Sequence, residues 1–200
     1  MLVPTAQVDV RELAVRHGLV AERFFLEMSR RSTGGVEVPA VPGTTLCRWE
    51  AGRSAEVHEL LRTAFRGQWG QVDPTPQMWA EQLASHTFRP HWTILAVDTS
   101  TQEVVGVALN VAYEQDWAPQ GYTEGYTDQL AVRASHRGRG IAGALLRASM
   151  NRFVEDHLGA AGLGVDSANP TGARQLYETL GYRPTAGTCI HQLTRPATAR

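Results

Sequence analysis

The stretch best suited to hold a charged ligand reads RGRGIA and covers residues 137–142. It follows an apolar run that ends at Val132, and it leads directly into an amphipathic segment. The first N–H groups of a helix lack intrahelical partners and carry the positive end of the helix dipole. Because glycine and alanine leave room beside these groups, phosphate oxygens can approach them, and Arg137 and Arg139 can add charge-assisted hydrogen bonds. The stretch therefore predicts a diphosphate-binding junction; the alternative is a tight strand-to-helix turn that binds nothing.

The side chains best suited to move protons are Tyr177, Asp128 and Glu124. A carboxylate can take a proton from a reacting group, and a phenol can give one. The alternation of side chains along a regular strand puts Glu124, Tyr126 and Asp128 on one face. Tyr177 follows Ala173 by one helical turn and shares its face. Two other interpretations stay open, in which Tyr177 is a core tyrosine and Asp128 binds the ammonium group of a substrate.

The elements that must position these residues alternate between strand and helix patterns. Apolar and β-branched runs predict strands at 44–49, 93–97, 104–112, 126–132, 162–165 and 188–193. Apolar residues at helical spacing predict helices at 55–65, 76–85, 141–158 and 171–180. This order predicts an α/β (α+β) fold in which helices cover the faces of a mixed sheet.

The N-terminal segment is set apart by residues 32–43, whose paired glycines and prolines predict an extended linker. Residues 1–31 are too few to bury a core of their own. They end in an apolar strand pattern at 19–29, and such a strand must pair with a sheet edge, either in this chain or in a second copy that forms a homodimer. The main domain is then expected over residues 44–195.

Residues 1–31 also resemble the end of the chain. At offsets of 163 and 165, the matched pairs are Arg11 and Arg174, Leu13 and Leu176, Gly18 and Gly181, Met28 and Leu193, and Arg30 and Arg195. In both copies a helical pattern ends at a glycine and an apolar strand pattern follows. We interpret residues 1–31 as the helix-strand remnant of a preceding copy of the domain, with a chance match as the alternative.

Composition excludes several classes of function. Hydrophobic residues make up 42% of the 200 residues and the net charge is −1, which is typical of a globular protein without a basic field for nucleic acid. All 19 basic residues are arginine, so lysine Schiff-base chemistry is excluded. The two cysteines, Cys47 and Cys189, indicate no disulfide framework, and the histidines show no metal-ligand spacing. We expect a cytoplasmic protein with no metal and no membrane segment.

Two motifs, in the right order and at the right spacing, resemble the GNAT superfamily of acetyl-CoA-dependent N-acyltransferases. RGRGIA is similar to the acetyl-CoA signature of that family, Arg/Gln-x-x-Gly-x-Gly/Ala. Downstream, Asn169, Ala173 and Tyr177 follow one another at four-residue steps before Gly181 and Tyr182, as in the family. The resemblance covers residues 44–195, its specific part lies within 128–182, and the end-to-end repeat further resembles tandem GNAT proteins.

The resemblance implies a fold and a cofactor. The fold would be a mixed, mostly antiparallel sheet of six or seven strands with helices on both faces. Its central strands, ending near Val132 and Val165, would splay apart so that the pantetheine arm of acetyl-CoA lies between them. The residues then expected to contact the cofactor are Leu130, Ala131, Val132, Arg137, Gly138, Arg139, Gly140, Ile141, Ala142, Asn169, Ala173 and Tyr177.

The resemblance also implies roles and a reaction. Tyr177 matches the family position whose hydroxyl faces the sulfur of CoA. The position where many members carry a glutamate is Tyr126 here, so we expect Asp128 to be the general base, with Glu124 second. The implied reaction moves acetyl from acetyl-CoA to a primary amine of a small molecule by direct attack in a ternary complex. The alternatives are a non-catalytic, CoA-binding regulatory module and a protein N-acetyltransferase.

Overall fold

The computed structural model describes residues 1–70, 73–168 and 172–193, and they form two compact units. One unit comprises residues 31–161. The other comprises residues 1–30 together with the chain from residue 162 onward. The described residues contain eight strands and six α-helices, and every strand ladder described below is antiparallel, so the α/β class and the mostly antiparallel pairing are confirmed.

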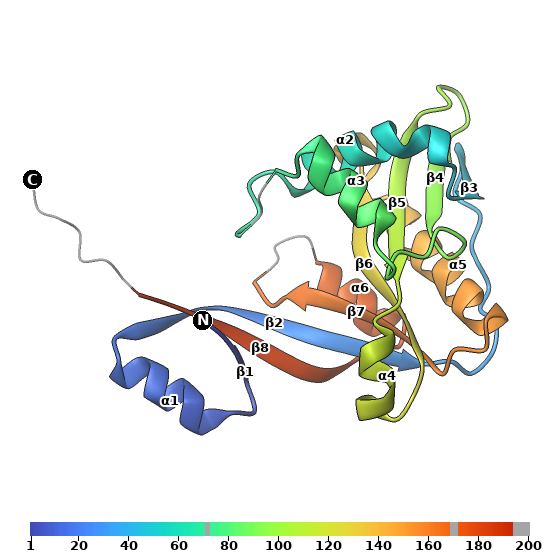
Figure 1. Ribbon diagram of the computed structural model, residues 1–200. Coiled ribbons are helices and arrows are strands. Elements are labelled where there is room, and N and C mark those ends of the chain that lie inside the picture. Colours follow the sequence, from blue (N-terminus) through green and yellow to red (C-terminus); the bar gives the residue numbers. More distant parts are fainter. Residues whose placement is uncertain (71–72, 169–171, 194–200) are drawn as a thin grey trace, which may run out of the picture. The chain divides into compact units, whose positions relative to one another are not determined.

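The unit of residues 31–161 is built on four antiparallel strands in the order β3-β4-β5-β6. Their bounds are β3 (Thr44–Arg48), β4 (Ile94–Asp98), β5 (Val104–Val111) and β6 (Glu124–Val132). The helices are η1 (Ala51–Arg53), α2 (Ser54–Phe65), α3 (Pro76–Ala84), α4 (Glu114–Gln120), η2 (Ala134–His136) and α5 (Ile141–Glu155). Figure 1 shows α2 and α3 on one face of these strands and α5 on the other.

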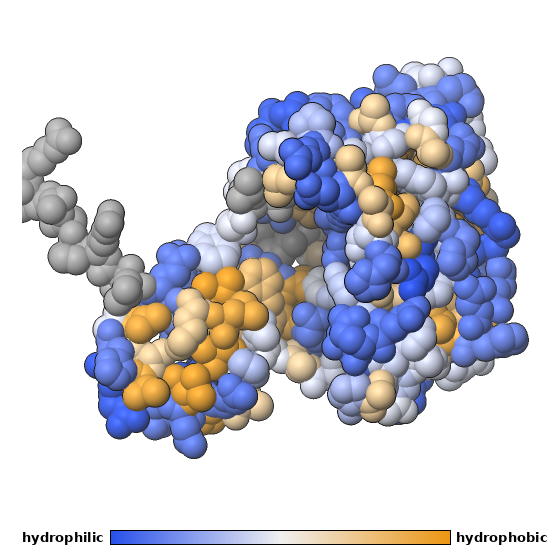
Figure 2. Space-filling view, viewed as in Figure 1, coloured by the Kyte–Doolittle hydropathy of each residue, from blue (hydrophilic) through white to orange (hydrophobic). Residues whose placement is uncertain are grey.

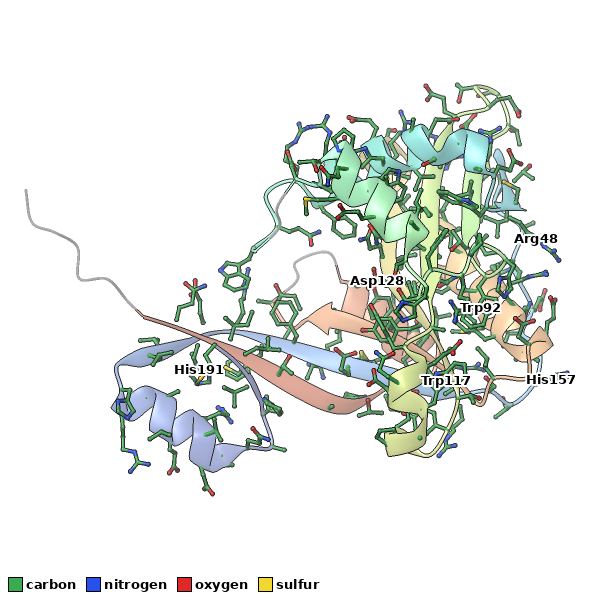
Figure 3. The ribbon with its side chains drawn as sticks, in the orientation of Figure 1. Arg48, Trp92, Trp117, Asp128, His157 and His191 are labelled. Carbon is green, nitrogen blue, oxygen red and sulfur yellow. The ribbon has the colours of Figure 1, made fainter. Side chains whose placement is uncertain are left out.

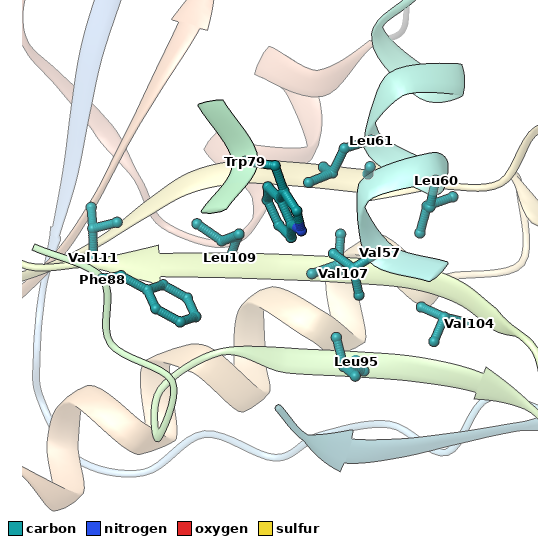
Figure 4. Close-up of a cluster of buried hydrophobic side chains, with 11 residues drawn as sticks. Val57, Leu60, Leu61, Trp79, Phe88, Leu95, Val104, Val107, Leu109 and Val111 are labelled. Atoms are coloured by element: carbon teal, nitrogen blue, oxygen red, sulfur yellow. The ribbon is translucent and has the colours of Figure 1, made fainter. Parts of the chain in front are cut away.

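β5 is buried along its whole length because both faces of the sheet are covered. Val107, Leu109 and Val111 point to the face under α2 and α3, where Figure 4 shows them packed with Val57, Leu60, Leu61 and Trp79. Val105 and Ala108 point to the opposite face and pack against α5. The apolar spacing within α2 and α5 that predicted helices therefore supplies the two layers that fix β5 and β6 in place.

β6 and α5 approach closely, and one glycine permits the contact. A Cβ atom on Gly125 would lie 2.2 Å from the Phe153 ring. Because no side chain fits there, the glycine at position 125 allows the Phe153 ring of α5 to pack directly on the start of β6. The same face of β6 carries Thr127, whose hydroxyl is buried.

The second unit pairs the N-terminal segment with the end of the chain. Its elements are β1 (Leu2–Pro4), α1 (Val8–Arg16), β2 (Leu19–Arg31), α6 (Ala173–Thr179) and β8 (Arg183–Leu193), while β7 (Ala160–Asp166) carries the chain between the units. β8 pairs with β1 on one side and β2 on the other, with Phe24 opposite Cys189. The strand predicted at 19–29 therefore pairs with a strand of this same chain, β8.

Several boundaries differ from the sequence expectations. α4 was not predicted, because its residues are polar and include Pro119, and it ends at Gly121 with φ +78°. β8 begins at Arg183 rather than at 188, since Pro184 and Gly187 weaken the strand pattern. β1 and β2 raise the strand count to eight, above the six or seven expected. The splay between the strands ending near Val132 and Val165 stays a prediction.

Residues 32–43 are all described and carry no helix or strand. Within the described ranges, no helix combines the length and the apolar character needed to cross a membrane.

Candidate functional site

The strand-to-helix junction leaves open space beside the first turn of α5. β6 ends at Val132, and α5 begins at Ile141, whose side chain is buried and anchors the helix to the core. Gly138 and Gly140 have φ values of +74° and +84°, and a Cβ atom on either would meet no heavy atom within 4 Å. The protein itself therefore does not fill this space, and an anion can reach the N–H groups of the helix start.

Two arginines flank this space. Arg137 Nε donates to Val132 O at 3.1 Å, and Arg139 Nη2 donates to Pro42 O at 2.9 Å. Both residues are exposed, and these bonds hold each guanidinium beside the junction. The chemistry of the donor set, backbone N–H groups with two guanidinium groups, fits a diphosphate.

A hydrogen-bonded contact between two side chains ties the start of the junction to the turn between β4 and β5. His136 Nε2 lies 3.1 Å from Asp98 Oδ2. Asp98 Oδ1 accepts from Ser100 Oγ at 2.6 Å, Ser100 N at 2.8 Å and Thr101 N at 3.0 Å. These hydrogen bonds, that of the Ser100 hydroxyl first, hold the pKa of Asp98 well below its usual range. Sequence reasoning missed Asp98, because nothing in the pattern links it to a loop 38 residues later.

Asp128, labelled in Figure 3, is the extra residue of a β-bulge that the register of β5 and β6 defines. Leu109 pairs with Gln129 and Asn110 pairs with Thr127, so Asp128 has no partner residue on β5. The bulge puts Asp128 and Gln129 on the face under α2 and α3, one after the other.

Two side chains donate hydrogen bonds to the Asp128 carboxyl. Tyr113 Oη donates to Oδ1 at 3.0 Å, and Gln82 Nε2 donates to Oδ2 over a long 3.5 Å. Asp128 is solvent-exposed, yet the protein atoms crowded around it desolvate the carboxyl and raise its pKa, while the Tyr113 hydrogen bond acts in the opposite direction. A raised pKa makes this carboxylate a better proton acceptor near neutral pH. Sequence reasoning missed Tyr113 and Gln82, which tertiary packing alone brings here.

A cavity of about 210 Å³ lies beside Asp128. Gln82 links the two, because it lines the cavity and also donates to the Asp128 carboxyl. The cavity is lined by His58, Leu61, Phe65, Pro74, Met78, Trp79, Gln82 and Gln129. The ring of His58 stacks on Trp79 at 5.4 Å, and His58 Nε2 lies 3.0 Å from Pro74 O. The lining contains no aspartate, glutamate or arginine, so the cavity suits an uncharged group.

Glu124 and Tyr126 share the Asp128 face of β6, because Gly125 and Thr127 point toward α5. Tyr126 packs edge-on against Tyr113 at 5.3 Å and so supports the phenol that bonds Asp128. Glu124 lies at the first residue of β6, and its carbonyl accepts from Trp117 Nε1 at 3.1 Å. Further along β6, Ala131 packs on the α2 and α3 face, and Leu130 and Val132 pack on the α5 face.

Tyr177 lies on α6, in the other unit. It is buried, packs edge-on against Tyr182 at 6.2 Å, and has its pKa raised by burial to about 12. Such a phenol stays protonated at neutral pH and can donate a proton. Ala173 is the first residue of α6, and Asn169 lies outside the described residues.

Among the described residues, no three His, Cys, Asp or Glu side chains gather as metal ligands would. Cys47 and Cys189 are free thiols.

Comparisons with known proteins identify the family and the fold. The model of the acetyltransferase (GNAT) family matches residues 54–182, more than half of the chain. A mycothiol acetyltransferase from Kocuria rhizophila is 28% identical over 179 residues, which cover 86% of this chain and 58% of that protein. This chain therefore spans less than two thirds of that relative.

Solved structures share the fold. A GCN5-related N-acetyltransferase from Sphaerobacter thermophilus superposes with a TM-score of 0.81 at 23% identity, over 98% of this chain and 59% of that chain. A tandem GNAT protein from the clavulanic acid biosynthesis pathway has a TM-score of 0.64 at 16% identity, over 94% of this chain and 59% of that chain.

Proposed function

The chain belongs to the GNAT family of acetyltransferases, and from this premise we propose that it transfers acetyl from acetyl-CoA to a primary amine of a small molecule in a ternary complex. The observation that carries the proposal is the open junction before α5, where two left-handed glycines and two arginines surround the N–H groups of a helix start. Acetyl-CoA would supply the acetyl group already activated as a thioester.

The junction would bind the diphosphate of the cofactor. Backbone N–H groups of residues 137–142 would donate to its oxygens, and Arg137 and Arg139 would balance its charge. The backbone of residues 130–132 would hold the pantetheine arm in the manner of an added strand, and an N–H group near Val132 would polarise the carbonyl under attack.

Asp128 would act as the general base. Its carboxylate takes the proton that the amine nitrogen loses as the new N–C bond forms, directly or through one water. Tyr177 would protonate the thiolate that leaves when the C–S bond breaks. The products are an amide and a free thiol; solvent then takes the extra proton from Asp128 and returns a proton to Tyr177.

The cavity beside Asp128 favours a small acceptor. An apolar cavity of about 150 Å³ accommodates benzene, so the cavity of about 210 Å³ has room for one uncharged ring. The amine would lie at Asp128 and the rest of the acceptor in the cavity. A peptide acceptor would need a longer groove than this compact cavity.

Two variants test the roles. Asp128→Asn and Tyr177→Phe should each keep the affinity for CoA and lower turnover at least about tenfold, because each loses one proton-transfer step. The assay measures free thiol released from acetyl-CoA across a panel of small primary amines and one of peptides. Turnover that both variants retain in full would contradict the assigned roles. CoA binding without thiol release on either panel would favour a regulatory module.

A further inference from the structure

A buried hydrogen-bond network lies directly behind Asp128, on the opposite face of the sheet. Asn110, Thr127, Ser149 and Thr93 are buried, with at most 4% of any of these residues exposed. Thr127 Oγ1 donates to Asn110 Oδ1 at 2.7 Å, and Asn110 Nδ2 donates to Ser149 Oγ at 2.8 Å. These polar groups interrupt a face that is otherwise apolar and covered by α5.

The network uses every hydrogen-bonding group of the Asn110 side chain. Its Nδ2 donates a second time, to Trp92 O at 2.7 Å, and its backbone N donates to Thr93 Oγ1 at 3.0 Å. Ser149 Oγ in turn donates to Leu145 O at 3.1 Å within α5. A buried network that is fully satisfied favours one arrangement of its members strongly, because any shift leaves a polar group unpaired away from water.

The network holds the two residues that define the bulge. Asn110 and Thr127 are the cross-strand pair at which the register of β5 and β6 changes, and Asp128 is the residue left over. A slip of one residue along β6 would remove Thr127 from Asn110 and turn Asp128 to the other face. We infer that the Thr127 and Asn110 hydrogen bond is a positioning device that fixes the bulge and so aims Asp128 at the acceptor.

This inference rests on the proposed function only for the role of Asp128 as general base. The position of Asp128 that the inference predicts can be measured without an activity assay. Thr127→Val keeps the shape of the side chain and removes the donor to Asn110 Oδ1. The bulge should then relax, and Asp128 should move away from the atoms that desolvate its carboxyl and lose the Tyr113 hydrogen bond. The titratable group that hydrogen-bonds the carboxyl is the phenol of Tyr113, the residue before α4; Gln82 from α3 is uncharged.

The experiment is a carboxyl NMR titration of Asp128, combined with steady-state kinetics. In Thr127→Val, the pKa of Asp128 should fall toward the ordinary aspartate value, and kcat should drop roughly fivefold or more while KM for acetyl-CoA stays unchanged. Thr127→Ser retains the hydroxyl and should restore both. Ile94→Ala is the control for simple destabilisation, since its apolar side chain packs in the cluster under α5 and makes no hydrogen bond to the network.

The outcomes separate the inference from the proposed function. If Thr127→Val leaves the pKa of Asp128 unchanged, or if Ile94→Ala shifts it equally, the positioning role is wrong. If the pKa shifts as expected but Asp128→Asn keeps full turnover, the positioning stands and the proposed base is wrong. Should Thr127→Val fail to fold, Thr127→Ala removes the same donor without placing a second methyl group near Asn110 Oδ1.

Discussion

At the scale of single residues, Asp128 combines exposure to solvent with a desolvated carboxyl, and this combination has a cost in stability. A carboxyl whose pKa is higher in the folded state than in the unfolded state binds its proton more tightly when folded. Its protonated form therefore stabilises the fold, and this contribution is lost as the pH rises through the folded pKa. At neutral pH, the ionised carboxylate destabilises the protein.

Asp128→Asn should accordingly stabilise the protein at pH 7 while it lowers turnover. The amide is neutral, has almost the same shape, and can still accept from Tyr113 Oη. The urea midpoint of the variant should exceed that of the parent at pH 7, and the difference should vanish as the pH falls below the ordinary aspartate pKa.

Asp116→Asn serves as a control of opposite sign. Asp116 lies in the first turn of α4, where a negative charge favours the helix dipole, so its loss should lower the urea midpoint slightly. An Asp128→Asn midpoint below that of the parent at pH 7 would contradict the desolvation of Asp128.

At the scale of elements, the strand-to-helix junction contains glycines whose proposed role in binding CoA can be tested separately from the strain of a left-handed backbone. Gly138 and Gly67 have nearly equal φ values, +74° and +78°, and a Cβ atom on either would meet nothing within 4 Å. Substitution by alanine at either should cost about 1 kcal/mol of stability, because both positions are left-handed. Only Gly138→Ala should also weaken CoA binding, by about tenfold or more, since its methyl group would occupy the path of a phosphate.

Calorimetric titration with CoA, together with denaturation of both variants, measures this difference. Equal losses of affinity in Gly138→Ala and Gly67→Ala would show that strain alone is responsible and would contradict the diphosphate site.

The elements also show what a sequence can predict here. The helical stripe after Ile141 and the apolar run of β5 suffice to predict α5 and β5, and the sequence also predicted the strand-to-helix junction between β6 and α5 correctly. The bulge at Asp128 was not, because a strand with period-two alternation looks the same whether or not one residue is left over. Its cause is a hydrogen bond between Thr127 and Asn110, 17 residues apart. Tyr113, just before α4, and Gln82, on α3, both hydrogen-bond Asp128, and no local pattern predicts these contacts.

At the scale of the whole molecule, the N-terminal segment shares its structure with the C-terminal end. α1 and α6 are each followed by a left-handed glycine, Gly18 with φ +78° and Gly181 with φ +88°, and then by a long strand. Phe24 and Cys189, which the repeat offset of 165 relates, face each other across β2 and β8.

The same segment carries an unusual surface. Nine large hydrophobic side chains are exposed among the described residues, and eight of them lie within residues 1–24: Met1, Leu2, Val8, Val10, Leu13, Val15, Val20 and Phe24. Figure 2 shows this apolar patch over α1 and the neighbouring strands. We propose that residues 1–31 are the last helix and strand of a preceding copy of the domain, consistent with relatives that are longer than this chain.

Deletion of residues 1–31 should uncover β8 on both edges, because β1 and β2 are its partners. Unpaired strand edges recruit other chains, so the truncated protein should aggregate, and its urea midpoint should fall. Deletion of residues 1–7 removes β1 alone and should have a smaller effect. Size-exclusion chromatography distinguishes the results, and a monodisperse truncation of residues 1–31 with the parental midpoint would contradict this account. Exchange of β2 between two copies stays a prediction that the same measurement addresses in the parent protein.

The most direct test of the central claim compares two ligands by calorimetry on the intact chain. CoA and pantetheine share the same arm, but pantetheine lacks the diphosphate that residues 137–142 are proposed to hold, together with the adenosine 3′-phosphate attached to it. We expect CoA to bind with micromolar affinity and pantetheine to bind at least about a hundredfold more weakly, since the charge-assisted contacts are lost. Equal affinity for both ligands, or no measurable binding of CoA, would contradict the account.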